Sequence, residues 1–151
     1  LLQQPCETYV ANMRVRVEAA NFFAYSDVVV VFDQPSFAND MFDTLLNPTV
    51  IIEILSYSTA SYDRGSKFHH YRRLASLQEY ILIHQEQAAI EHYTLEDGKW
   101  TLMDIFGLDK KLQLDSTGCE ISLQDIYEKV EFPQDEPQKN PAAGIRLNRS
   151  T

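Results

Sequence analysis

The chain has 151 residues and a mass of 17.4 kDa, which is the size of one domain with a substantial core. Hydrophobic residues make up 44% of it, and no apolar run approaches the ~20 residues that a membrane-spanning helix needs. Its net charge of −9 argues against a protein that coats nucleic acid without selectivity.

Strand-like patterns fill the first third of the chain. Four segments are predicted to be strands: residues 8–18, 22–25, 28–32 and 49–55. The run VVVVF at 28–32 is continuous and β-branched, which is typical of a central strand buried on both faces. Two of the apolar segments carry an acid, because Asp27 stands immediately before VVVVF and Glu53 interrupts VIIEIL.

The rest of the chain mixes helix and strand signals. An amphipathic helix is predicted from 63 to 75. Residues 79–84, 89–95 and 100–106 are predicted to be strands, with a hairpin turn at Glu96-Asp97-Gly98. Ser122, with an acid three residues later, indicates the start of a short helix over 123–130. The whole pattern predicts an α+β fold, in which a mixed β-sheet is flanked by helices.

The domain organisation is simple. One domain is predicted over residues 1–132, and residues 133–151, rich in Pro, Gln and Asn, are predicted to form an extended or mobile tail. Because the chain opens on Leu1 and soon enters strand-like sequence, we expect an N-terminal piece to be missing. Cys6 and Cys119 indicate two reduced thiols in a cytoplasmic protein without a secretory signal, with one long-range disulfide as the alternative.

The two acids on apolar strands are the main chemical signal. Burying an unpaired carboxylate is expensive, so buried strands seldom carry one. If the strands of Asp27 and Glu53 are neighbours, their carboxylates converge and repel each other unless a cation lies between them. A site of hard oxygen ligands suits Mg²⁺ or Mn²⁺.

These residues also have ordinary structural explanations. Asp27 suits a turn or a strand cap, and Glu53 suits an ion pair with a nearby arginine. The candidate arginines are Arg14, Arg16 and Arg64. Lys67 suits an exposed helix lysine paired with Asp63, four residues earlier.

Four segments together resemble a known family. They are residues 25–31 (YSDVVVV), 47–59 (NPTVIIEILSYST), 62–71 (YDRGSKFHHY) and 77–82 (LQEYIL). In order and spacing they resemble the Uma-type endonucleases of the restriction-endonuclease-like superfamily, which is named for its PD-(D/E)XK motif. The resemblance covers residues 5–132. It implies the superfamily's core, an α/β/α sandwich around a mixed sheet, here without the usual N-terminal helix and its additional acid.

The resemblance also implies a set of site residues. Asp27 matches the aspartate of the first half-motif and Glu53 the acid of the second, and both would bind Mg²⁺ together with the backbone carbonyl of Ile54. The superfamily's lysine usually follows two residues after the second acid, where this chain has Leu55. In Uma-type proteins the lysine lies on the following helix, and Lys67 matches it.

Further expectations follow from that match. Ser26 replaces the motif proline, which supplies no ligand, and Tyr71 is expected to line the site one turn beyond the matching lysine. Arg64, Arg72 and Arg73 form a local basic patch that could contact phosphates. The leading hypothesis is therefore a Mg²⁺- or Mn²⁺-dependent DNA endonuclease, expected to act as a homodimer. The alternative is a catalytically inactive nucleic-acid-binding or dimerisation module with the nuclease fold.

Overall fold

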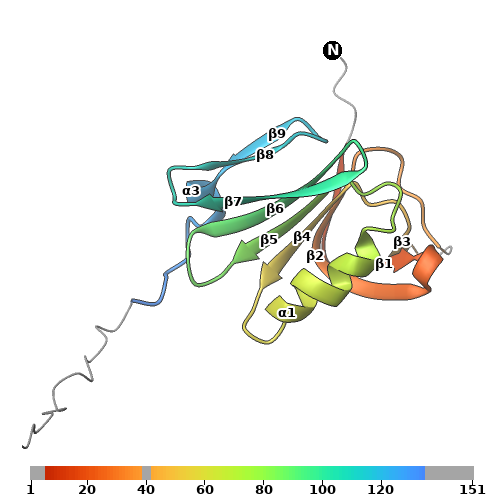
Figure 1. The fold of residues 1–151 in the computed structure, drawn as a ribbon, viewed down its shortest axis with the longest axis horizontal. Coiled ribbons are helices and arrows are strands. Elements are labelled where there is room, and N and C mark those ends of the chain that lie inside the picture. Colours follow the sequence, from red (N-terminus) through yellow and green to blue (C-terminus); the bar gives the residue numbers. More distant parts are fainter. Residues whose placement is uncertain (1–5, 39–41, 135–151) are drawn as a thin grey trace, which may run out of the picture.

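A seven-stranded mixed β-sheet forms the centre of the molecule (Figure 1). The computed structural model describes residues 6–38 and 42–134. The strand order is β3-β1-β2-β4-β5-β6-β7, and only β1/β3 and β4/β5 are parallel neighbours. The strands are β1 (Glu7–Val17), β2 (Phe22–Val31), β3 (Thr44–Leu45), β4 (Val50–Leu55), β5 (Glu79–His84), β6 (Ala89–Glu96) and β7 (Lys99–Phe106).

The strands predicted for the first third of the chain are present, with two segments merged. Residues 22–25 and the valine run belong to one long strand, β2, which pairs with β1 on one side and β4 on the other. The β1–β2 register shifts between Val10 and Met13, opposite Asp27, so that two residues of β1 face one residue of β2. Such bulges re-aim side chains and are frequent beside active sites.

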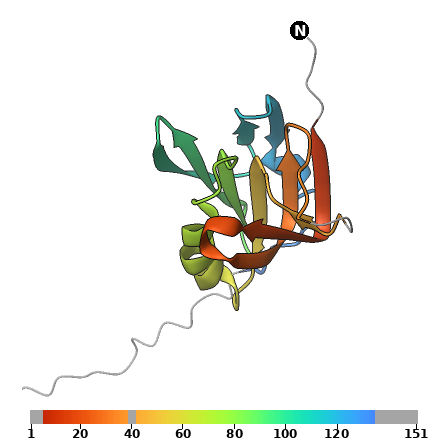
Figure 2. The ribbon, with the colours of Figure 1, turned by 90° about the vertical axis from the view of Figure 1, so that its right-hand side faces the viewer.

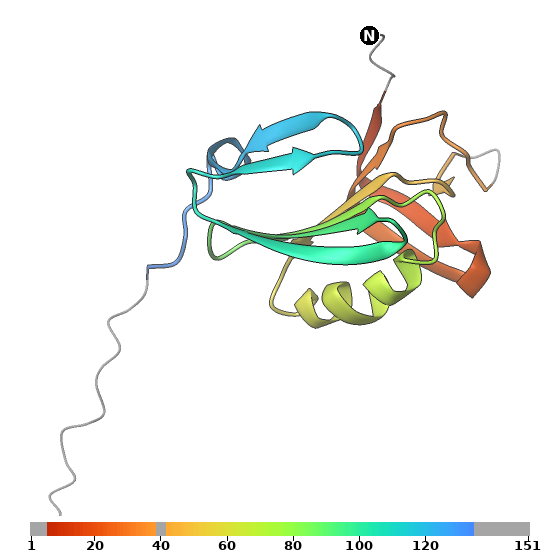
Figure 3. The ribbon, with the colours of Figure 1, turned by 45° about the horizontal axis from the view of Figure 1, so that its top comes forward.

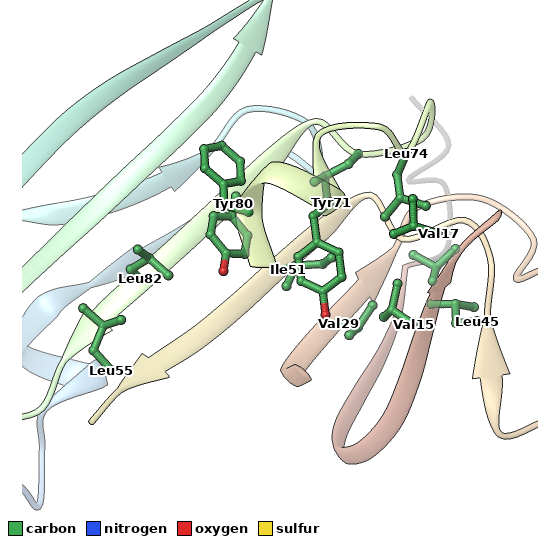
Figure 4. Close-up of a cluster of buried hydrophobic side chains, with 13 residues drawn as sticks. Val15, Val17, Val29, Leu45, Ile51, Leu55, Tyr71, Leu74, Tyr80 and Leu82 are labelled. Carbon is green, nitrogen blue, oxygen red and sulfur yellow. The ribbon is translucent and has the colours of Figure 1, made fainter. Parts of the chain in front are cut away.

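One continuous helical segment covers one face of the sheet (Figure 3). It consists of α1 (Ala60–Tyr62), the wider π-helical turn η2 (Asp63–Lys67) and α2 (Phe68–Tyr71). The helix thus begins and ends earlier than the predicted 63–75. Between it and the sheet lies the first hydrophobic cluster, which includes Val15, Val29, Ile51, Tyr71 and Tyr80 (Figure 4).

The end of the β1–β2 ribbon lies beside this helical segment (Figure 2). The Phe22 ring stacks on His70 at 4.3 Å between centroids and meets Tyr71 edge-on at 6.0 Å. The short 3-10 turn η1 (Glu18–Ala20) connects the two strands, and Asn21 follows it with a left-handed φ of 47°. These contacts fix the helix over β2 and β4, the two strands that carry the acids.

The opposite face of the sheet is covered by a β-hairpin and a short helix (Figure 3). They are β8 (Lys111–Leu114), β9 (Cys119–Ser122) and α3 (Leu123–Ile126), and the hairpin was not predicted from the sequence. Leu112, Leu114 and Leu123 pack there on Val30 and Ile52 of the sheet in a second hydrophobic cluster. Ser122 caps α3 as predicted, accepting a hydrogen bond from the Asp125 amide at 3.1 Å, but α3 is shorter than 123–130.

The observed architecture is the predicted α+β arrangement of a mixed sheet with covered faces. The predicted hairpin turn is present, since Asp97 and Gly98, with φ of 48° and 75°, connect β6 to β7. In the described part of the chain, no helix is long and apolar enough to cross a membrane. Of the predicted tail, residues 135–151 lie outside the described residues, as do residues 1–5 at the start.

Candidate active site

Asp27 and Glu53 lie next to each other on neighbouring antiparallel strands. The β2–β4 ladder ends at the pair Val28↔Ile52, and the two acids are the next residues along each strand. The Ile54 amide donates a hydrogen bond to Asp27 Oδ2 at 2.8 Å. In return, the Asp27 amide donates a long hydrogen bond of 3.4 Å to Glu53 Oε2. Each carboxylate thus accepts a hydrogen bond from the backbone of the other strand.

Glu53 is the buried member of the pair. It is only 2% exposed, whereas Asp27 is exposed to solvent. Burial raises the pKa of Glu53 to about 7, because the nearby Lys67 ammonium and the Ser26 hydroxyl offset only part of the desolvation cost. Glu53 Oε1 lies 2.8 Å from Lys67 Nζ, but among the described residues no donor makes a well-aligned hydrogen bond to it. Glu53 is therefore a carboxylate whose charge is incompletely compensated within the protein.

Lys67 is buried in the same place, although it comes from the helix. Its side chain is 7% exposed, and Nζ donates a hydrogen bond to the Tyr25 carbonyl at 2.9 Å. Nζ also lies 3.5 Å from Asp63 Oδ1, so the pair four residues apart that the sequence suggests does exist, but inside the protein. Both residues belong to the π-helical turn η2, and such turns often mark functional sites.

Tyr71 and Ser26 complete the inner wall of the site. The Tyr71 hydroxyl lies 2.8 Å from Ser26 Oγ, and both residues are buried. The Tyr71 ring centroid is 5.9 Å from Lys67 Nζ, which places this tyrosine beside the lysine as the sequence suggested. Burial raises the pKa of the Tyr71 phenol well above its ordinary value, so this hydroxyl is a hydrogen-bonding group and not an acid at neutral pH.

The three arginines proposed as phosphate contacts do not gather at the acids. Arg64 makes a two-pronged ion pair with Glu91, with a shortest distance of 2.7 Å from Nη2 to Oε2. Arg72 packs over the Phe68 ring at 5.2 Å from its centroid, and Arg73 is exposed beyond the end of α2. Of the arginines expected as partners of Glu53, Arg64 pairs with Glu91 instead, and Glu53 forms its ion pair with Lys67 and not with Arg14 or Arg16.

Two histidines that could have formed a separate site are engaged elsewhere. His84 contacts Glu91 at 3.0 Å, and His92 contacts Glu79 at 2.5 Å, so they do not meet across the β5–β6 hairpin. Within residues 6–38 and 42–134, no group of three or more His, Cys, Asp or Glu side chains is arranged to hold a metal ion. Any cation at the site would therefore depend on two carboxylates supplemented by backbone and water oxygens.

The donor set fits a small hard cation. Asp27 and Glu53 supply carboxylate oxygens, and Glu53 has an oxygen that its protein surroundings leave without a directed donor. Mg²⁺ typically takes one or two carboxylates and keeps several waters, so two acids are sufficient. Burial raises the pKa of Glu53 and so disfavours its ionised form. A bound cation would act in the opposite direction and favour the ionised form.

Ser26 and Asp63 were not predicted to take part in the site. In the sequence Ser26 is only a replacement for the motif proline, yet its hydroxyl connects Tyr71 with the surroundings of Glu53. The sequence predicts Asp63 as a surface partner of Lys67, but Asp63 is only 4% exposed. The signal for Asp63 was its spacing from the lysine, but burial of the pair depends on tertiary structure.

Comparison with known proteins places the chain in a family. The model of the Uma2 family, described as "Putative restriction endonuclease", matches residues 1–125. Two uncharacterized proteins of Synechocystis sp. are 34% and 30% identical over 71% and 84% of this chain, which spans 61% and 66% of their lengths. A crystal structure from Anabaena variabilis, of "a putative nuclease belonging to DUF820", shares the fold with a TM-score of 0.67 at 15% identity, over 84% of this chain and 70% of that one. The chain therefore belongs to the Uma2 family and has its nuclease-like fold.

Proposed function

We propose that this chain is the nuclease domain of a divalent-metal-dependent DNA endonuclease. One observation carries the proposal: acids from two neighbouring strands and a lysine from the helix meet at one place, with Lys67 Nζ 2.8 Å from Glu53 Oε1. Family membership and the nuclease-like fold support the general class of activity. Asp27, Glu53 and the Ile54 carbonyl would hold Mg²⁺ or Mn²⁺.

The chemistry of phosphodiester hydrolysis matches these groups. A cation bound there would lower the pKa of a coordinated water and polarise a phosphoryl oxygen. As an ammonium, Lys67 would orient the attacking water by donating a hydrogen bond to it, or neutralise charge that develops on the phosphate. Tyr25, through its carbonyl, and Asp63 hold the ammonium in position for either role. Asp27, the exposed acid, is the one that solvent and substrate reach first.

The proposal is tested by DNA cleavage. Purified chain should nick or cut supercoiled plasmid, and short single- and double-stranded oligonucleotides should be tried beside it, with Mg²⁺ or Mn²⁺ and with EDTA. We expect cleavage only with the metal, and we expect Asp27→Ala and Glu53→Gln to abolish it. Asp115→Asn, in the exposed β8–β9 turn, is the matched control and should cleave normally. Cleavage undiminished by Asp27→Ala would refute the assignment.

An inactive module with the same fold makes different predictions. If Lys67 only neutralises Glu53, the chain should not bind Mn²⁺. Replacement of Asp27 should then change the stability of the chain and nothing else. Calorimetric titration with Mn²⁺ separates the two cases, because a cation site requires both carboxylates.

We further propose a homodimer, because two such sites would allow both strands of a duplex to be cut in one encounter. Light scattering of the purified chain measures the mass directly. A linear plasmid product that forms without a nicked intermediate would support two sites acting together, and a strictly monomeric chain would contradict this part of the proposal.

A further inference from the structure

The β1–β2 ribbon has an outer face that the nuclease proposal does not use. Along β1, Met13, Val15 and Val17 pack into the first hydrophobic cluster under the helix. Because side chains alternate along a strand, Arg14 and Arg16 project from the opposite side. Their cross-strand partners on β2 are Tyr25 and Phe23, respectively. We refer to these four residues, Arg14, Arg16, Phe23 and Tyr25, as the ribbon face.

The ribbon face holds two cations that have no acidic partner among the described residues. The Arg14 and Arg16 guanidinium carbons lie 5.0 and 5.3 Å from the centroid of the Phe23 ring, so one aromatic ring contacts both groups. Arg14 Nε donates to Thr44 Oγ1 at 2.9 Å, but Arg16 Nε is buried without an acceptor among the described residues. Neither arginine forms an ion pair with any described residue, in contrast to Arg64. In a chain of net charge −9, this is a local positive surface.

Tyr25 presents an aromatic ring beside these cations. It is 61% exposed, and Phe23 is 43% exposed. The layer formed by β8, β9 and α3 packs on β2 only from Val28 onward, so this end of the strand is not covered by it. An exposed tyrosine beside two arginines is the combination that proteins use to stack a base and bind the adjoining phosphates.

The ribbon face is connected directly to the candidate active site. The backbone carbonyl of Tyr25 accepts the hydrogen bond from Lys67 Nζ, and Asp27 follows two residues later on the same strand. The ribbon face and the helix lie on opposite sides of the sheet, so a nucleic-acid strand held on the ribbon face would lie close to the exposed Asp27 and not to the buried Glu53.

We propose that the ribbon face binds a single strand of nucleic acid, with phosphates on Arg14 and Arg16 and an unpaired base stacked on Tyr25. The arginines alone would accept a duplex equally well, but an aromatic face can stack only on a base that its neighbours leave free. That the bound strand is the one presented for cleavage rests on the proposed function, whereas the binding itself does not.

Fluorescence anisotropy without metal tests the binding. The probes are a labelled oligothymidine, an abasic oligonucleotide of the same length and phosphate count, and a duplex, all with the intact chain in EDTA. We expect oligothymidine to bind most tightly. Tyr25→Ala should weaken it by about fivefold or more, whereas Tyr25→Phe, which keeps the ring, should restore binding. The double variant Arg14→Gln/Arg16→Gln should weaken all three probes.

The matched control is Phe106→Ala. Phe106 is 60% exposed at the end of β7, the opposite edge strand of the sheet, and its loss should change nothing. The inference is overturned if Tyr25→Ala binds oligothymidine like the wild type, if the abasic probe binds as tightly as oligothymidine, or if the chain binds no probe. Because no metal and no cleavage are involved, these outcomes are independent of whether the chain cuts DNA.

Discussion

Lys67 and Glu53 form an ion pair in which the side chains are only 7% and 3% exposed. A buried pair of this kind stabilises little in comparison with a well-packed apolar pair, and removal of one partner leaves an uncompensated charge. In the metal-free chain the ammonium is the counter-ion that lets Glu53 remain inside. The same geometry places a proton-bearing group beside the carboxylate that would hold the cation, so the structural and the proposed catalytic roles of Lys67 can be separated only by experiment.

Lys67→Met is expected to abolish most activity while leaving a folded chain. Loss of a positioned acid–base or charge-stabilising group typically costs about 10²–10⁴-fold in rate. Without the ammonium, the pKa of Glu53 rises further above its ordinary 4.5. At low pH the folded chain therefore holds Glu53 in its protonated form. The contribution of a raised carboxyl pKa to stability is present below the unfolded value and is lost as the pH rises.

Urea unfolding at pH 5 and pH 8 measures this effect. Lys67→Met should lose more stability between the two pH values than the wild type does, and the double variant Lys67→Met/Glu53→Gln should lose the additional pH dependence. Equal pH dependence in wild type and Lys67→Met would show that the two residues are not coupled.

Divalent cations are expected to stabilise the chain more at pH 8 than at pH 6. The cation binds the ionised carboxylate, and the pKa of Glu53 is raised to about 7 by burial, so at pH 6 binding must first displace a proton. Thermal unfolding with and without Mn²⁺ at both pH values gives the measurement. The shift should vanish in Asp27→Asn and in Glu53→Gln and persist in Asp115→Asn. A shift that is independent of Asp27 would locate the cation elsewhere.

In the Ser26→Ala variant, cation binding is expected to begin at a higher pH than in the wild type. The Ser26 hydroxyl lowers the pKa of Glu53, opposing part of the effect of burial, so its removal should raise the pKa and make the ionised form harder to reach. Tyr71→Phe is the control, because it removes the 2.8 Å contact with Ser26 but leaves the serine hydroxyl free to hydrogen-bond to Glu53. The Tyr71→Phe variant should lose about 1 kcal/mol of stability, while the pH at which the cation binds should stay as in the wild type. If both variants shift the profile equally, Ser26 acts only through packing.

Much of the geometry of the candidate site was predictable, because it follows from local patterns. The run VVVVF and the segment VIIEIL predict buried strands, and an acid on each is unusual enough to indicate a site. That Asp27 and Glu53 are adjacent then requires only that β2 and β4 are neighbours, which the structure shows. The β6–β7 turn was equally readable, since Asp97-Gly98 supplies the left-handed backbone that a two-residue hairpin needs.

Other features depend on contacts that no local pattern encodes. Strands β8 and β9 have four residues each and include exposed charged side chains, so their apolar alternation is too short to stand out. The π-helical turn at Asp63 has an ordinary helical sequence, and its burial of Lys67 follows from packing against β4. The ribbon face was not predicted, because in the sequence Arg14 and Arg16 are plausible ion-pair partners for Glu53. The β1–β2 pairing is needed to show that they lie beside Tyr25 and Phe23 instead.

A further buried acid, Glu79, provides a prediction that concerns stability alone. It is 1% exposed at the start of β5, with His92 Nε2 at 2.5 Å, and it accepts hydrogen bonds from the Ser116 amide at 2.9 Å and from the Ser116 hydroxyl. Burial by itself would raise the pKa of Glu79, but the bonds from His92 and Ser116 together outweigh it and lower the pKa below 4.5. The carboxylate thus connects the sheet to the β8–β9 turn.

Glu79→Gln is therefore expected to remove part of the acid sensitivity of the fold. A lowered carboxyl pKa contributes stability that is present above the unfolded value of 4.5 and is lost as the pH falls toward the folded value. The variant should be less stable than the wild type at pH 7, by about 1–3 kcal/mol for the lost charge-assisted hydrogen bonds, and the difference should narrow as the pH falls. Urea unfolding between pH 7 and pH 4 measures both. Glu120→Gln, which changes an exposed acid on β9, is the control. If the difference in stability between Glu79→Gln and the wild type stays constant with pH, Glu79 acts by its shape and not by its charge.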